Sequence, residues 1–441
     1  MSAIAALPAA RRIQRIYLAL LLGNTLAASF IWGINTLFLL DAGLSNLEAF
    51  AANAFFTAGM VIFEVPTGVI ADTVGRRASY LLGTLTLAVS TALYWLMWLW
   101  QAPFWAWAIV SVLLGLGFTF FSGAVEAWLV DALRASGYEG GLEPVFARGV
   151  VVSGFAMLLG SVAGGVVAQA TDLGVPFLLR AGVLVAMFLI AFLVMRDVGF
   201  TPDRSEGPVQ AVRTLFRSSL RYGLGQKPVR YMMLAAPFTA GVGIYVFYAL
   251  QPYLLELWGD EEAYSIAGLA AAIVAGSQIL GGYIAPRVRR LFRKRTTTIL
   301  LSAAAGMLLL LSLGVTRSFW VALLLLTLWG VASAVGGPVR QAYVNDLIPS
   351  RQRATVLSFD SLMGSVGGVV IQPVLGRSAD VSGYPFSLVA SGAISAIALP
   401  FLFLSRRQNP PEDAAAGGAD LVPDGAPAPT PDLSGGPEPD R

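Results

Sequence analysis

Long apolar stretches recur along almost the entire chain. Each is about 20 residues or longer, which is the length that an α-helix needs to cross the hydrocarbon core of a bilayer. The connections between them are short, except at residues 196–230. The pattern predicts an all-α integral membrane protein with twelve transmembrane helices. Their expected residues are 16–40, 47–71, 78–100, 103–132, 146–170, 175–195, 231–256, 264–286, 297–315, 318–346, 355–377 and 384–405.

Composition supports this class of protein. Of the 441 residues, 56% are apolar and 12% are charged, whereas about 25% of a typical soluble domain is charged. Mean hydropathy is +0.71. Arg11, Arg12 and Arg15 precede the first apolar stretch, as in a signal peptide, but no small-residue cleavage site follows a short apolar core. We therefore expect a transmembrane helix there.

Positive charge predicts the orientation. If the N-terminus is cytoplasmic, 26 of the 29 lysines and arginines fall in inner segments, and the exceptions are Arg180, Arg317 and Arg377. Because Lys and Arg accumulate in cytoplasmic loops, we expect a multi-pass protein of the inner (plasma) membrane with both termini in the cytoplasm.

The two halves of the chain repeat one another. Arg148-x-x-Val151-x-Ser153 recurs as Arg353-x-x-Val356-x-Ser358, and a glycine-rich run follows each copy, at 160–167 and 364–370. Repeats of six spans are an architecture of secondary transporters. Within the central loop, residues 209–221 suit either an amphipathic helix on the inner membrane surface or a solvated linker. The expected parts are an N-terminal six-helix half, a cytoplasmic central loop, a C-terminal six-helix half and a disordered cytoplasmic tail rich in proline and acids, at residues 1–195, 196–230, 231–405 and 406–441.

Missing residue types exclude several chemistries. The chain has no cysteine and no histidine, which excludes disulfides, thiolate catalysis and the usual metal sites. Neither lysine, Lys227 or Lys294, lies in a phosphate-binding loop. We expect no metal, no cofactor and no nucleic-acid partner, and any proton must be carried by carboxylates.

One motif resembles a known family. The sequence Gly68-x-x-Ala71-Asp72-x-x-Gly75-Arg76-Arg77 is similar to the signature loop of the major facilitator superfamily, G-x-x-A-D-R-x-G-R-R/K, and lies between spans two and three, as that loop does. Thr73 stands where the family usually has a basic residue. Two further segments, 64–67 and 353–355, resemble a prokaryotic drug-efflux-like branch. The resemblance covers all twelve spans and implies a monomeric transporter whose two halves rock around a central site.

The resemblance also implies a gate. Asp72 would lie beside the N-terminus of span eleven, near Thr355, where a helix dipole stabilises a carboxylate. Arg76 would pair with Asp131 at the end of span four. Together with Gly68, Gly75 and Arg77, these residues would hold the inner side shut, unless they are ordinary juxtamembrane charges. The run 160–165 resembles a degenerate antiporter motif, with Ser161 in place of proline, and is equally explained as a helix-packing surface.

Ionisable residues inside spans are candidates for function because they are expensive to insert. The clear cases are Glu64, Glu126 and Asp360, with Arg180 as a possible fourth. Burial disfavours the charged form of a carboxylate, so each could exchange a proton. Glu126 is the first choice because fourth spans line the cavity in the family. The alternative for each acid is a packing or gate residue.

The family geometry places spans one, four, seven and ten around the cavity. Their middle portions carry mostly aromatic side chains, which suit a lipophilic molecule, although such residues are more often packing. The candidates are Phe30, Trp32, Asn35, Phe118, Phe121, Tyr245, Tyr248, Gln251 and Trp329.

The predicted function is secondary active transport by alternating access, with proton-coupled export of a lipophilic small molecule. The alternative is uptake of a metabolite by proton symport or facilitated diffusion. A membrane-embedded enzyme would need an acid pair or a Ser–Lys pair, and neither lysine lies in a span. A sensor or scaffold without transport activity is a third possibility.

Overall fold

The computed structural model describes residues 3–121, 123–202, 225–348 and 353–413. The part that it describes consists of α-helices joined by short connections and one 3-10 turn. The first group of helices is α1 (Ala3–Trp32), α2 (Asn35–Asp41), α3 (Asn46–Thr73), α4 (Arg76–Trp100), α5 (Phe104–Thr119), α6 (Ala124–Ala135), α7 (Glu143–Ala170) and α8 (Val175–Val194). The second group is α10 (Lys227–Trp258), α11 (Tyr264–Arg290), α12 (Arg295–Val315), α13 (Phe319–Leu347), α14 (Arg353–Ala396) and α15 (Ala398–Gln408), followed by η2 (Pro411–Asp413).

The prediction of twelve spans is confirmed. In the described residues, eleven helical segments are long and apolar enough to cross a membrane. The last, Val356–Gln408, has 53 residues, and a helix of that length would extend about 80 Å, more than twice the thickness of a hydrocarbon core of about 30 Å. Gly383 interrupts it with a φ of 79°, a conformation that glycine adopts without strain. The segment therefore turns at Gly383 and forms the last two spans.

Two of the predicted spans are broken. The first divides between α1 and α2, and the fourth divides between α5 and α6, where Gly123 has a φ of 69°. A break leaves backbone groups without helical partners. At the first break, Gln251 of the second group accepts from the Thr36 N–H at 2.9 Å and donates to the Trp32 carbonyl at 2.6 Å. A side chain of the opposite half thus supplies hydrogen-bond partners to the irregular backbone at this break.

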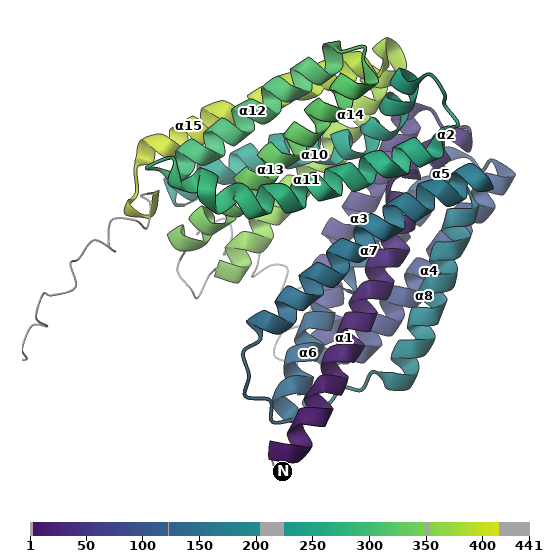
Figure 1. Cartoon of the computed structure of the whole chain (residues 1–441), viewed down its shortest axis with the longest axis vertical. Coiled ribbons are helices and arrows are strands. Elements are labelled where there is room, and N and C mark those ends of the chain that lie inside the picture. The colour runs from purple at the N-terminus through teal and green to yellow at the C-terminus, as the bar shows by residue number, and fades with distance from the viewer. Residues whose placement is uncertain (1–2, 122, 203–224, 349–352, 414–441) are drawn as a thin grey trace, which may run out of the picture.

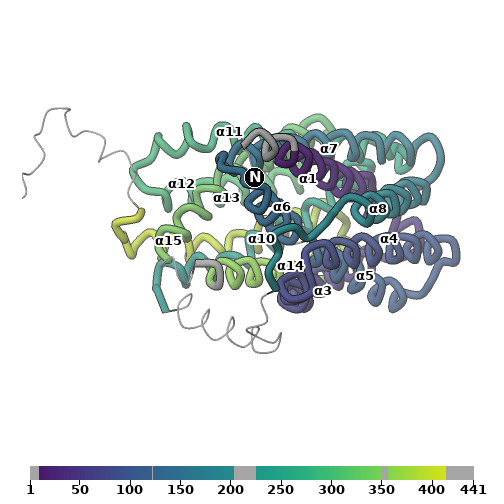
Figure 2. The backbone as a smooth tube through the Cα atoms, turned by 90° about the horizontal axis from the view of Figure 1, so that it is seen from below, coloured from purple at the N-terminus to yellow at the C-terminus, as the bar shows by residue number. Residues whose placement is uncertain are grey.

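The two groups of helices meet at one end and diverge toward the other (Figure 1). Seen along the bundle, they lie side by side, and α7 faces α11 while α3 faces α14 (Figure 2). We call the end where they meet the closed end; it carries the connections α2–α3, α4–α5, α7–α8, α10–α11 and α12–α13, and Gly383. The opposite end, which carries the start of α1 and the end of α15, is the open end.

Hydrogen bonds between the groups hold the closed end together. Asp380 of α14 accepts from the backbone N–H groups of Asn46 and Leu47, both at 2.9 Å, in the first turn of α3. The Ser265 N–H of α11 donates to the Gln169 side chain of α7 at 3.4 Å. Deeper between the groups, the rings of Phe50 and Tyr245 pack 4.6 Å apart.

The outer surface of the helices is apolar. Large side chains such as Leu189, Leu193 and Val370 are exposed on spans, as expected where lipid replaces water. At the closed end, exposed tryptophans lie at the helix ends, namely Trp100, Trp105, Trp258 and Trp320. Tryptophan is enriched at membrane interfaces, and these side chains therefore mark one boundary of the bilayer.

The predicted tail needs a correction. Residues 406–408 belong to α15, and Asp413 is 1% exposed. Its carboxylate accepts from the Thr296 N–H at 2.8 Å and from the Thr296 hydroxyl at 2.6 Å, and so caps the start of α12. The rest of the predicted tail, like the candidate amphipathic segment at 209–221, lies outside the described residues.

Candidate functional site

A cavity of about 1220 Å³ lies between the two groups of helices. It begins beneath the closed end, beside Trp32 and Tyr248, and extends toward the open end as far as Val344 and Leu357. Helices of both groups line it. Because contacts between the groups close only one end, a molecule in the cavity is reached from one side of the membrane.

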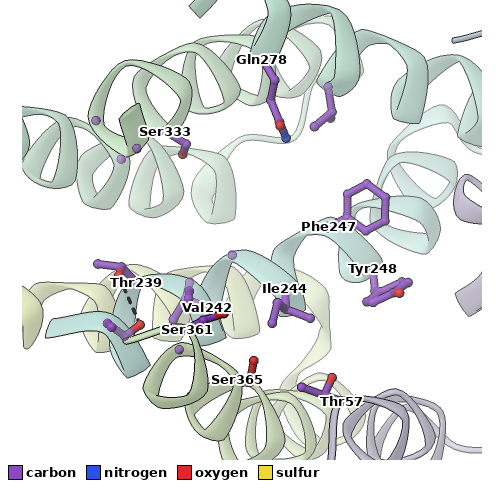
Figure 3. Close-up of a pocket in the computed structure, with 18 of the residues that line it drawn as sticks. Thr57, Thr239, Val242, Ile244, Phe247, Tyr248, Gln278, Ser333, Ser361 and Ser365 are labelled. Atoms are coloured by element: carbon purple, nitrogen blue, oxygen red, sulfur yellow. Dashed lines mark hydrogen bonds between the residues drawn. The ribbon is translucent and has the colours of Figure 1, made fainter. Parts of the chain in front are cut away.

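The wall is mostly apolar, with scattered polar groups. Figure 3 shows Gln278 and Ser333 on one side of the cavity, facing Thr239 and Ser361 on the other. Nearer the closed end, the buried Asn35 side chain donates to Oδ1 of Asn53 at 3.0 Å. These amides and hydroxyls give the cavity more polar groups than the aromatic pattern of the sequence predicted.

Five of the nine candidate cavity residues line the cavity. They are Trp32, Asn35, Phe118, Tyr248 and Trp329.

The other four do not line this cavity, so their assignment to its wall is corrected. Tyr245 is fully buried, and its hydroxyl donates to Ser387 at 2.6 Å. Gln251 is occupied by the backbone of the first-span break. Phe30 packs in the core of the first group, and Phe121 lines a separate small cavity. Helical spacing fixed which residues share a span, but the rotation of each helix decided which of them face the cavity.

Three charged residues line the cavity within the described chain, and two of them pair. Asp360 accepts from both Nη atoms of Arg340, at 2.7 and 2.6 Å. This bidentate geometry stabilises the carboxylate. The sequence does not predict Arg340 as a site residue. It lies near the end of a span, where a positive charge is explained by the orientation rule for cytoplasmic segments. The third charged residue, Arg180, has no such partner among the residues that the structure describes.

Two of the candidate carboxylates line one smaller cavity. Glu64 of α3 and Glu126 of α6 both line a space of about 470 Å³ in the first group. Met60 and Phe118 line this space as well as the central cavity. The break between α5 and α6 places Glu126 in the first turn of α6, where the helix dipole favours a negative charge.

The signature loop is anchored within the first group. A Cβ added to Gly75, which has a φ of 135°, would lie 2.3 Å from Oδ2 of Asp197. Oδ1 of Asp197 accepts from the Arg77 N–H at 2.9 Å, and so caps the first turn of α4. Burial raises the pKa of Asp197, while the hydrogen bond and the nearby arginines lower it in part. Asp197 was missed in the sequence because no motif contains it.

The ion pair of the loop differs from the one that the resemblance implied. Arg76, at the start of α4, pairs at 2.5 Å with Asp72, near the end of α3, rather than with Asp131. Asp131 nonetheless lies near the loop, within electrostatic reach of Asp197. Asp72 is 51% exposed, and a Cβ added to Gly68 would meet no atom within 4 Å. Because the groups diverge at this end, the loop finds its partners within its own half.

The two glycine-rich runs form corresponding packing surfaces. A Cβ added to Gly164 of α7 would lie 1.9 Å from the Phe30 carbonyl oxygen of α1. A Cβ added to Gly367 of α14 would lie 2.2 Å from the Pro237 carbonyl oxygen of α10. In each half, the fifth span therefore packs backbone to backbone against the first. Helix packing is therefore sufficient to explain the glycine-rich run at 160–165 without an antiporter motif.

Comparison with known proteins identifies the family. The family model of the Major Facilitator Superfamily matches residues 17–333 and 297–433. An uncharacterized MFS-type transporter of Methanocaldococcus jannaschii is 20% identical over 381 residues, which cover 84% of this chain and 93% of that protein. The uncharacterized MFS-type transporter YxaM of Bacillus subtilis is 22% identical over 354 residues, which cover 77% of this chain and 82% of that protein.

Solved structures share the fold. The nucleoside transporter NupG superposes with a TM-score of 0.75 at 10% identity, covering 89% of this chain and 98% of that one. A D-xylose-proton symporter superposes with a TM-score of 0.64 at 18% identity, covering 89% and 97%. At such low sequence identities, these likenesses show a shared fold and nothing about substrate or mechanism. With the family model matching most of its length, the chain belongs to the major facilitator superfamily and is a multi-pass membrane transporter of that type rather than an enzyme.

Proposed function

We propose that the chain is a proton-coupled secondary transporter that exports a largely apolar small organic molecule by alternating access. The observation that supports this is the cavity of about 1220 Å³, which both groups of helices line and which contacts close at one end only. The cavity is somewhat larger than the pockets of about 300–1,000 Å³ that hold drug-sized ligands, so a molecule of that size fits in it. Rocking of the two groups would open the closed end and close the other.

Glu126 is the proposed proton carrier, with Glu64 beside it. Both line a space that shares Met60 and Phe118 with the central cavity, so a change in their charge would be felt next to the substrate. Asp360 is less suited, because a proton on it would remove its charge and one of the two hydrogen bonds that it accepts from Arg340.

We further propose that the open end faces the cytoplasm. Clustered arginines at that end, including Arg287, Arg289 and Arg290 in the last turn of α11, follow the charge rule for cytoplasmic loops. The structure would then be the inward-facing state. In the outward-facing state, the exposed Asp72 and the open space beside Gly68 would receive the start of α14.

Proteoliposomes loaded with a pH-sensitive dye test the function. A panel of lipophilic anions, neutral molecules and cations is added from outside, and the wild type is compared with Glu126→Gln. Glu139→Gln is the matched control, because Glu139 is exposed in the α6–α7 connection at the same end. We expect substrate-evoked proton movement in the wild type and the control, and its loss in Glu126→Gln.

The results separate the alternatives. Proton movement that survives in Glu126→Gln would move the coupling role to Glu64. A substrate that accumulates together with protons would indicate symport instead of export. Substrate flux without proton movement would indicate facilitated diffusion, and the absence of any flux would argue for a protein without transport activity.

A further inference from the structure

Arg180 is a buried cation without a partner in the central cavity. It lies in the second turn of α8, near the closed end, and is 4% exposed. In the described part of the chain it forms no ion pair, and its Nε has no hydrogen-bond acceptor. Its polar neighbours are the phenol groups of Tyr94 and Tyr248, which also line the cavity. A buried charge is normally paired, and the described residues supply no counter-charge for this one.

A second donor in the same cavity is also unsatisfied. Asn53 is 6% exposed, and its Oδ1 accepts from Asn35, but its Nδ2 has no acceptor among the residues that the structure describes. Two buried side chains, from α3 and α8, therefore line the cavity, and each has a donor that lacks an acceptor among the described residues. Buried polar groups nearly always have partners, and a ligand with acceptor oxygens would supply partners to both of these side chains.

The charge of the cavity favours a negative ligand. Among its described lining residues, Arg340 and Asp360 neutralise each other, and Arg180 leaves one positive charge. A guanidinium presents donors in a fork that matches a carboxylate or another small oxyanion. A cationic substrate would instead meet a like charge inside a mostly apolar cavity, which is unfavourable.

We propose that the transported molecule is an organic anion whose carboxylate, or a similar small oxyanion group, binds Arg180 near the closed end. This rests on the proposed function, because it takes the cavity as the substrate site. The apolar body of the molecule lies along the aromatic part of the wall, formed by Trp32, Phe56, Phe118, Phe247 and Trp329. The Tyr248 side chain points into the same space (Figure 3) and places its hydroxyl among the groups that meet the anion.

Binding of three naphthalene probes to the purified protein in detergent tests this inference. The probes are 2-naphthoate, 2-naphthylmethanol and 2-naphthylmethylammonium, which share one apolar body and differ in charge. Because charge-assisted hydrogen bonds are strong, we expect 2-naphthoate to bind roughly ten- to hundredfold more tightly than the other two. In Arg180→Gln this preference is lost, and Arg180→Lys keeps part of it.

Arg317→Gln is the matched control. It removes the same charge near the same end of the protein, but Arg317 is exposed in the α12–α13 connection. It should leave the preference for 2-naphthoate unchanged.

Thermal unfolding without ligand provides a second measurement. Arg180→Gln should keep or raise the Tm, because the substitution removes a buried charge that has no partner. A lower Tm combined with an unchanged preference for 2-naphthoate would assign Arg180 a structural role and overturn the proposal. Binding of the ammonium probe as tightly as the carboxylate, or no binding of 2-naphthoate in the millimolar range, would overturn it as well. These measurements need no proton gradient, so their outcome is separate from that of the proton-coupling experiment.

Discussion

The carboxylate of Asp380 is predicted to hold the closed end shut. It accepts from two backbone N–H groups at the start of α3, so one half of the protein caps a helix of the other. This contact exists only while the closed end is closed. Asp380→Asn should therefore shift the conformational equilibrium toward the state in which that end is open.

The size of the shift follows from the geometry. Hydrogen bonds to a charged group contribute about 1.5–3 kcal/mol net, and a carboxylate at a helix N-terminus adds about 0.3–1 kcal/mol. Asparagine keeps one acceptor oxygen and loses the charge. We expect a loss of about 1.5 kcal/mol, which changes the equilibrium roughly tenfold.

Cysteine labelling measures this change directly, because the chain contains no cysteine of its own. Thr36 is fully buried between the halves at the closed end, so Thr36→Cys reacts with a maleimide only when that end opens. With Asp380→Asn, the labelling rate should rise roughly tenfold.

Asp172→Asn is the control for this experiment. Asp172 caps α8 at the same end through Gly174 and Val175, but all three residues belong to one half. It should lower the stability without raising the labelling rate. An unchanged rate in Asp380→Asn, or an equal rise in both variants, would refute the assignment of Asp380 as the latch.

Three further predictions concern packing and charge. Gly164→Ala should destabilise the protein by about 1–3 kcal/mol in thermal unfolding, because its Cβ would lie 1.9 Å from a backbone oxygen. The control Gly182→Ala, whose Cβ would meet no atom within 4 Å, should be neutral or slightly stabilising. Equal losses of stability in the two variants would contradict the packing argument. Asp360→Asn should cost about 3 kcal/mol, because it leaves Arg340 partly buried and unpaired; the double variant with Arg340→Gln should recover part of this loss, and a purely additive result would show that the pair is not coupled. Asp72→Asn should favour the conformation with the open end open, and unchanged accessibility of a cysteine at that end would contradict the gate role.

The sequence determined the class and topology of this protein. Apolar stretches long enough to span a bilayer have few other structures available, because backbone groups in lipid must be satisfied within a helix. The twelve spans were therefore predictable. The signature loop between the second and third spans also pointed to the family, since its glycines and charges occur in one local segment.

The breaks in the helices depended on tertiary contacts. The first span divides after Trp32 because Gln251, far away in the sequence, supplies hydrogen bonds to the exposed backbone. No local signal predicts such a partner. The sequence assigns Gln251 to the cavity for the same reason: it places Gln251 in the seventh span, but nothing local shows that its partner is the backbone of the first span.

The site was decided by helix rotation and by the conformation of the whole molecule. A period of 3.6 residues predicts which side chains share a face, but transmembrane helices are apolar all round, so the sequence does not show which face meets the cavity. Tyr245 and Tyr248 are one turn apart in α10, and only Tyr248 lines the cavity. Likewise, the sequence showed that Arg180 lies in a span, while only the packing of α8 beside the cavity shows that this buried charge has no partner within the described protein.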